Sequence, residues 1–286
     1  MKRVLAFIVC ALLGHTAPAD TINPPLVRIV SLAPSLTELV FALGLEDHLI
    51  GRTNICDYPE AAAGIPIVGS FGRPTWEILV QIQPDIVLVT DLEKPGFLQQ
   101  MKQRDMTPLV LPSDSWKELK KAARAIADAV GESAVGEQWS ATLDEEIAAV
   151  RAEVEAFWTD HPQRPSLYVE IWGQPITTVG RNTFLHDVMT LAGAHPLSQH
   201  VRGDYVTVSS EWLLQTDPDV ILLAYMLPDL QAVQKLQDRP GWSRLSALQA
   251  NRVITTINPD WLLRPGPRLI LGARALAEEL QRLFAE

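Results

Sequence analysis

Cysteine is scarce in this sequence, which has only Cys10 and Cys56 among its 286 residues. Because Cys10 stands in an N-terminal segment that we expect to be removed, a disulfide framework is excluded. A lone cysteine such as Cys56 is more often a small buried apolar residue than a nucleophile. The fold must therefore depend on a hydrophobic core, and a content of 47% hydrophobic residues is ample for one.

Catalytic motifs are missing as well. The chain has no G-x-S-x-G turn, no H-E-x-x-H helix, no phosphate-binding P-loop and no G-x-G-x-x-G turn. His195 and His200 lie five residues apart around Pro196, which is a poor spacing for one helix face, so we expect no metal site. A secreted α/β enzyme, such as a hydrolase, stays as an alternative that no motif supports.

Basic residues are in the minority, with 24 Lys and Arg against 34 Asp and Glu. Loss of Lys2 and Arg3 with the N-terminal segment would leave 22 basic residues and a formal charge of −12. A chain of this charge is a poor partner for nucleic acid or for an anionic membrane surface. We therefore expect neither as the main partner.

The N-terminus has the pattern of a secretory signal peptide. Two basic residues precede an apolar run at residues 4–13, and the small residues Ala17-Pro18-Ala19 offer a cleavage site. We expect residues 1–19 to be removed and the exported chain to begin at Asp20. Cys10 lies inside the apolar run rather than after it, which disfavours a lipoprotein. The sequence has no other run that could cross a membrane.

One motif occurs twice, as WEILVQIQPDIVLV at residues 76–89 and as SEWLLQTDPDVILL at residues 210–223. The offset of 134 residues is about half the chain, which indicates two similar lobes rather than a solenoid. Glu77 and Glu211 hold equivalent places near the start of two expected helices. A carboxylate there stabilises a helix by about 0.3–1 kcal/mol. Two acids on two similar lobes could also dock on a pseudo-two-fold receptor that carries basic pockets.

Strands alternate with helices in both halves, which predicts parallel βαβ units and the α/β class. We expect strands at residues 27–32, 48–53, 86–90, 107–112, 166–171, 218–224 and 252–257, and helices that include 36–45, 75–83, 209–217 and a closing helix within 264–284. Ser35 with Glu38 reads as a capping box for the first helix, and Thr75 as the N-cap of the second. The predicted organisation is an N-terminal lobe at 27–112, a connecting region at 113–162 and a C-terminal lobe at 163–286.

Apolar residues within 132–158 recur every three or four positions without a proline, which predicts one long helix. At about 1.5 Å per residue this helix is roughly 40 Å long and would act as a strut between the lobes. The aromatic residues Tyr58, Phe71, Trp172, Tyr205 and Trp261 fall in predicted loops of both lobes. Together they suit a cleft for a large flat or apolar ligand, although each could instead fill a gap in its own lobe.

Several blocks in order resemble the periplasmic binding proteins with a helical backbone, which serve ABC importers of cobalamin, haem and ferric siderophores. These blocks are RIVSLAPSLTELVFALGL, CDYP, WEILVQIQPDIVLV and DWLLRPGPRLILGARAL, and the resemblance runs from about Val27 to Phe284. It implies two α/β lobes bridged by one long helix, with the ligand between the lobes. It also implies a periplasmic monomer without catalytic activity or a resident cofactor. Glu77 and Glu211 match acids that form salt bridges to arginines of the dimeric inner-membrane permease.

The cobalamin-binding branch is the closest match, although Phe71 and Tyr205 stand where a well-known member has tryptophans. Its cleft residues correspond here to Pro34, Tyr58, Phe71, Trp172, Tyr205, Asp260, Trp261 and Arg264. A siderophore carrier would meet an anionic ligand with arginines, for which the candidates are Arg73, Arg181, Arg202 and Arg264. A haem carrier would need an axial ligand, which Tyr58 or Tyr205 could supply.

Overall fold

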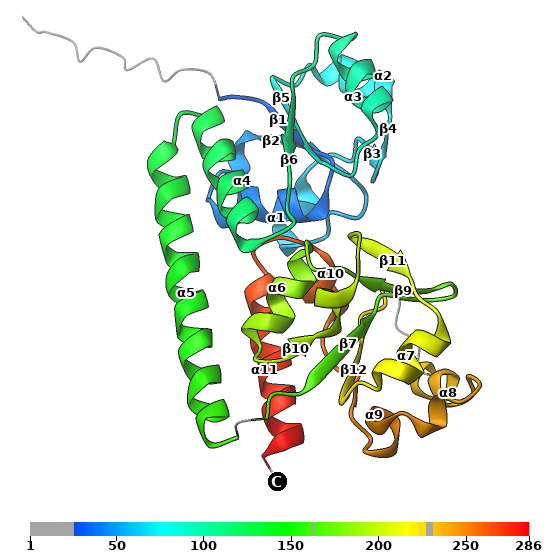
Figure 1. Cartoon of the computed structure of the whole chain (residues 1–286). Helices are drawn as coiled ribbons and strands as arrows, with labels where there is room; N and C mark the ends of the chain where they lie inside the picture. The colour runs from blue at the N-terminus through cyan, green and yellow to red at the C-terminus, as the bar shows by residue number, and fades with distance from the viewer. Residues whose placement is uncertain (1–25, 162, 227–230, 286) are drawn as a thin grey trace, which may run out of the picture.

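The computed structural model describes residues 26–161, 163–226 and 231–285. The expected signal peptide at residues 1–19 lies outside this part of the chain. Two lobes each contain a four-stranded parallel sheet, with the orders β2-β1-β5-β6 and β10-β7-β12-β13 (Figure 1). The α/β class and the two-lobed architecture predicted from the sequence are confirmed. The strands are β1 (Ile29–Ser31), β2 (Leu49–Arg52), β5 (Ile86–Thr90), β6 (Pro108–Leu111), β7 (Ser166–Glu170), β10 (His195–Pro196), β12 (Val220–Leu223) and β13 (Val253–Ile254).

Smaller strands and the helices complete the lobes. Two strands form a hairpin in the N-terminal lobe, and three form an antiparallel sheet in the order β11-β9-β8 in the C-terminal lobe. These strands are β3 (Gly69–Ser70), β4 (Arg73–Pro74), β8 (Trp172–Gly173), β9 (Ile176–Val179) and β11 (Tyr205–Thr207). The helices are α1 (Pro34–Ala42), α2 (Trp76–Ile82), α3 (Pro95–Lys102), α4 (Trp116–Ala129), α5 (Ser133–Asp160), α6 (Phe184–Leu191), α7 (Ser210–Thr216), α8 (Ala232–Gln237), α9 (Ser246–Gln249), α10 (Pro259–Leu263) and α11 (Leu269–Phe284).

The duplicated motif forms the same structure in both lobes. It folds as α2 followed by β5 in the first lobe and as α7 followed by β12 in the second. Both helices end at a residue in the left-handed region, Gln83 and Asp217, each with φ of 45°. The aspartates of the two Pro-Asp pairs then make equivalent hydrogen bonds. Asp85 accepts from the backbone N–H of Arg28 and Asp219 from that of Ser166, both at 2.8 Å. The repeat is therefore a structural unit that fixes a helix and two neighbouring strands.

Helix α5 runs along one side of both lobes (Figure 1). Its bounds agree with the predicted helix at 132–158. Leu143, Val150 and Val154 of the predicted stripe are buried in a hydrophobic cluster that also contains Leu88 of the first lobe and Leu222 of the second. Packing of one helix against a cluster shared by both lobes supports the strut interpretation. No helix within the described residues is both long and apolar enough to span a bilayer.

The predicted capping box of α1 is wrong. The N-cap is Ala33, which makes no side-chain cap, and Ser35 already lies inside the helix. Pro34 occupies the first turn, where its fixed φ suits the helix and its missing N–H has no consequence. Glu38 is buried and binds Arg268 instead of the backbone. At α2, Thr75 is the N-cap as predicted, but its side chain makes no cap hydrogen bond.

Candidate functional site

A cavity of about 430 Å³ lies between the two lobes and is called the interlobe cavity below. Its N-terminal wall comes from residues that follow β1 and β6, from the end of β5, and from the β3–β4 turn. Its C-terminal wall comes from Met226, beyond β12, and from the segment around α10. The carboxyl ends of parallel strands are where open α/β sheets bind ligands. The lining residues are Ala33, Pro34, Ser35, Ile55, Phe71, Thr90, Leu92, Ser113, Met226, Pro259, Asp260, Leu263, Arg264 and Pro265.

Four of the eight predicted ligand-binding residues line this cavity. Pro34 and Phe71 belong to the first lobe, and Asp260 and Arg264 to the second. Phe71 is 41% exposed, so its ring is available to a ligand. The structure thus brings together residues that are separated by more than half of the sequence.

The other four lie elsewhere. Trp172 lines a cavity of about 730 Å³ within the C-terminal lobe, which shares Met226 with the interlobe cavity. Tyr58 lines a crevice beside α5. Tyr205 lies exposed on β11, and Trp261 lies in α10 rather than in a loop and packs against the hydrophobic core.

Arg264 is held in place by acids from both lobes. It donates to Asp57 across the cleft, and its Nε lies 2.9 Å from Asp260 Oδ1. Burial opposes the charge of Arg264, but these acids raise the pKa of its guanidinium above its ordinary value. The hydrogen bond from Arg264 lowers the pKa of Asp57. The positive charge of Arg264 is therefore already balanced by acids of the protein.

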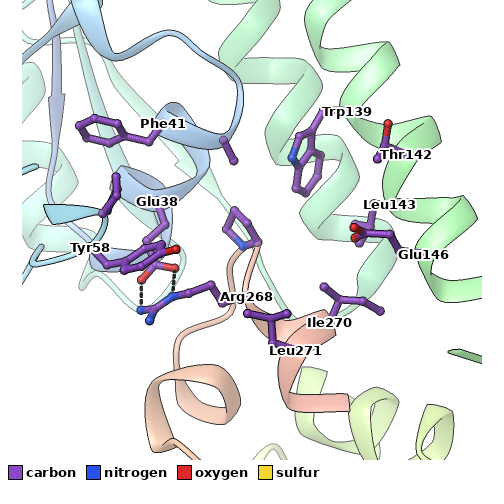
Figure 2. Close-up of a pocket in the computed structure, with 13 residues that line it drawn as sticks. Glu38, Phe41, Tyr58, Trp139, Thr142, Leu143, Glu146, Arg268, Ile270 and Leu271 are labelled. Atoms are coloured by element: carbon purple, nitrogen blue, oxygen red, sulfur yellow. Dashed lines mark hydrogen bonds and ion pairs between the residues drawn. The ribbon is translucent and has the colours of Figure 1, made fainter. Parts of the chain in front are cut away.

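A buried ion pair lies next to this contact. Arg268 donates to both carboxylate oxygens of Glu38, at 2.8 and 2.5 Å, although 230 residues separate the two in sequence. The guanidinium also stacks on Tyr58, 4.0 Å from the ring centroid. Figure 2 shows this group at one side of the crevice, opposite Trp139 of α5. Arg268 covers one face of the Tyr58 ring, and the residue stays 46% exposed, so Tyr58 contributes to the contact between the N-cap of α11 and the first lobe.

A second buried acid organises the larger cavity of the C-terminal lobe. Glu170 is fully buried and accepts from both terminal nitrogens of Arg239, at 2.7 and 2.8 Å. The hydroxyls of Tyr168 and Tyr225 also donate to it. Burial, followed by the interaction with Glu170, raises the pKa of the Tyr225 phenol. Within the part of the chain that the structure describes, the partners of the Glu170 side chain come from its own lobe, so this network rigidifies one wall rather than joining two.

A family model described as periplasmic binding protein matches residues 29–259, which is most of the chain. The chain belongs to the periplasmic binding protein family. Its relatives include an uncharacterised ABC transporter substrate-binding lipoprotein of Bacillus subtilis, YvrC, at 28% identity over 91% of this chain and 82% of that protein. Another is the vitamin B12-binding protein of Vibrio parahaemolyticus, at 24% identity over 91% of each chain.

Solved structures of periplasmic binding proteins share the fold. The vitamin B12 binding protein BtuF of Vibrio cholerae matches with a TM-score of 0.76 at 23% identity, over 92% of this chain and 99% of its own. The heme-binding protein RhuT of Roseiflexus matches with a TM-score of 0.77 at 24% identity, over 90% and 98%. The fold is therefore common to proteins named for different ligands.

In this periplasmic binding protein, Glu77 and Glu211 are both exposed in the first turns of α2 and α7. Hydrogen bonds from its own backbone and from Ser209 lower the pKa of Glu211. Arg73, Arg181 and Arg202 are exposed and do not line the interlobe cavity.

The ion pairs that join the lobes of this binding protein have no signature in the local sequence that identifies both partners. Asp57 is part of the quoted CDYP block, but nothing local indicates that it binds Arg264. Glu38 and Glu170 are acids within or beside apolar runs. Because an acid in such a run is rarely buried without a partner, this position was the one feature of the sequence that indicated a buried ion pair.

Proposed function

We propose that this protein captures a corrinoid in the periplasm and delivers it to an ABC importer of the inner membrane, as a carrier rather than an enzyme. The observation that carries the proposal is the interlobe cavity. Phe71 and Pro34 supply apolar surface there, and the guanidinium of Arg264 is occupied by acids of the protein. Such a site favours a large, mostly uncharged ligand over an anionic one.

The relatives named for vitamin B12 support this choice of ligand. Of the four arginines suggested for a siderophore, only Arg264 lines the cavity, and it is paired. Of the two tyrosines suggested as axial ligands for haem, Tyr58 lies in the separate crevice under Arg268. The binding site in this proposal consists of Pro34, Phe71, Asp260 and Arg264, with Trp172 at its C-terminal side.

The first test is calorimetric titration of the exported chain with cobalamin, cobinamide, haemin and a ferric hydroxamate siderophore. We expect saturable one-to-one binding of a corrinoid and no heat of binding from haemin or the siderophore. Binding of one of these in place of the corrinoids would overturn the ligand and leave the carrier role. Chemical turnover of any of the four would instead support the alternative of a secreted enzyme.

Docking on the permease dimer is the second part of the proposal, with Glu77 and Glu211 as one acid from each lobe. The double variant Glu77→Lys/Glu211→Lys should abolish ligand uptake through the importer, because each lysine would meet a basic pocket with like charge. Ligand affinity should stay within about twofold, since neither acid lines the interlobe cavity. Glu145→Lys, at an exposed acid of α5, is the matched control. Normal uptake by the double variant would exclude this docking role.

A further inference from the structure

One buried hydroxyl at the wall of the interlobe cavity has no hydrogen-bond partner among the described residues. Thr90 is the last residue of β5 and is 4% exposed, and its Oγ1 atom is unpaired. Buried polar atoms nearly always have a partner, because an unpaired one has lost its hydrogen bonds to water. Since Thr90 lines the cavity, a ligand could supply the missing partner.

The fold itself does not require this hydroxyl. The strand before it, Val87–Val89, is apolar throughout, and valine has nearly the shape of threonine. The repeat offset of 134 residues places Ala224 at the equivalent position of the second lobe, where the chain is apolar. The hydroxyl is therefore a feature of the first lobe alone, at the wall of the interlobe cavity.

Aspartates neighbour the polar lining residues in the chain, although they are exposed and are not themselves among the lining residues. Asp91 follows Thr90, and Asp114 follows Ser113, a second buried residue of the lining. Across the cleft, Asp204 precedes Tyr205 in the C-terminal lobe. Partial desolvation of the phenol, followed by the charges of Asp114, Asp204 and Asp91, raises the pKa of Tyr205 to about 12. Acids of both lobes thus act on the same phenol.

No free cation of the lining balances these acids. Among the described residues that line the interlobe cavity, Arg264 is the only cationic side chain. Its guanidinium is bound to Asp57 and Asp260. The lining at Thr90 therefore offers two hydroxyls, which can donate or accept, and no free cation for an anionic ligand group.

On the basis of the proposed function, we propose that Thr90 and Ser113, with Asp91 and Asp114 beside them, form a subsite that selects primary carboxamides of the ligand and rejects carboxylates. An amide N–H can donate to the Thr90 hydroxyl or to a carboxylate. A ligand carboxylate could accept from the hydroxyls but would face the like charges of Asp91 and Asp114, and repulsion of this kind contributes to specificity.

The test compares cyanocobalamin with its monocarboxylic acid derivatives, in which one peripheral carboxamide is hydrolysed. By calorimetry, at least one of these acids should bind wild type tenfold or more weakly than the parent amide. Thr90→Val should lose about three- to tenfold in affinity for cyanocobalamin, whereas Thr90→Ser should keep it. Asp91→Asn/Asp114→Asn should narrow the difference between amide and acid, and Glu145→Gln should not change it.

Two measurements without ligand test the same subsite. Thr90→Val should unfold at an equal or higher temperature than wild type, since it removes an unsatisfied hydroxyl; a lower temperature would mean that the protein itself binds the hydroxyl. In Asp91→Asn/Asp114→Asn, the absorbance titration of Tyr205, identified by comparison with Tyr205→Phe, should move to lower pH. No movement would overturn the placement of the acids.

The failures of the two proposals can be told apart. Equal affinity of wild type for the amide and every acid would overturn the subsite and leave corrinoid capture intact. Binding of a neutral ferric hydroxamate in place of corrinoids would overturn corrinoid capture; if Thr90→Val weakened that binding, the Thr90 hydroxyl would remain a ligand contact but its assignment to carboxamides would be overturned. Tight binding of haemin, which carries two carboxylates, would overturn both.

Discussion

Removal of Arg268 should leave the buried Glu38 carboxylate without a side-chain hydrogen bond among the described residues, with Arg264 Nη1 at 3.7 Å as its remaining cation. Glu38 is 3% exposed, and both of its oxygens accept hydrogen bonds from Arg268. Burial raises the pKa of Glu38 above its ordinary value of 4.5, and Arg268 opposes that shift. In Arg268→Met the opposing interaction is lost, so the pKa of Glu38 should rise further. Breaking a buried pair in this way costs about 3–5 kcal/mol of unfolding free energy.

The pH dependence of stability provides a second check on the loss of unfolding free energy expected for Arg268→Met. Glu38 can avoid the buried charge by taking up a proton, and each pH unit above its unfolded pKa adds about 1.4 kcal/mol to that cost. Between 4.5 and neutral pH the cost of protonation grows to about 3 kcal/mol, and at pH 5 it is below about 1 kcal/mol. A raised folded pKa means that the stabilisation is present below pH 4.5 and is lost as pH rises. The deficit of Arg268→Met should therefore be largest at pH 7 and small at pH 5.

Urea unfolding of wild type, Arg268→Met and Glu38→Leu/Arg268→Met, each at pH 5 and pH 7, measures this effect. The double variant should recover most of the loss, because an apolar pair of similar size leaves no charge in the core. Arg282→Met is the matched control, since Arg282 of α11 is exposed and its ion pair with the partly buried Glu279 contributes about 1 kcal/mol. A deficit that is equal at both pH values, or that the double variant does not recover, would refute the reasoning.

The remaining predictions concern packing and ligand binding. Gly136→Val in α5 should destabilise the protein by about 1–3 kcal/mol, because a Cβ there would meet Arg124 Cα and Ala127 Cβ of α4 at 2.9 Å. Gly96→Ala in α3, where a Cβ meets nothing within 4 Å, should leave stability unchanged or raise it. Thermal unfolding of both glycine variants beside wild type measures these effects. Phe71→Ala should weaken corrinoid binding about tenfold in calorimetry, which corresponds to about 1.4 kcal/mol. Trp261→Ala should lower the unfolding temperature more than it lowers affinity, because Trp261 packs on the core; a large loss of affinity with unchanged stability would instead place its ring in the cleft.

Local pattern was sufficient for the main parallel strands and the long helix, but not for α3, α4 or the small antiparallel sheet, which the sequence analysis did not predict. The strand predicted at 86–90 is β5, and the helix predicted at 132–158 is α5 at Ser133–Asp160. Both rest on runs of apolar residues whose period or length identifies the element without knowledge of its neighbours. The predicted capping box failed because Ser35 and Glu38 have a plausible local role, while the actual partner of Glu38 is remote in sequence.

The candidate site was harder to predict, because a loop position does not say which cavity a side chain enters. Phe71 lines the interlobe cavity, whereas Tyr58 and Trp172 line two other cavities and Trp261 packs on the core. All four were predicted as ligand-binding from the same kinds of signal, aromatic character, a loop and the resemblance. Only the directions in which their side chains point distinguish the aromatic residue that lines the interlobe cavity from the three that do not.

The sequence by itself determined the duplication, the alternation of strands and helices, and the long helix between the lobes, since each depends on residues close together along the chain. The tertiary structure alone decided which charges are paired. Arg264 meets Asp57 across 207 residues and Arg268 meets Glu38 across 230, and no spacing rule connects residues so far apart. The physical reason is that ion pairs depend on distance in space and on exclusion of water. Both are set only when the closing segment of the chain packs against the first lobe.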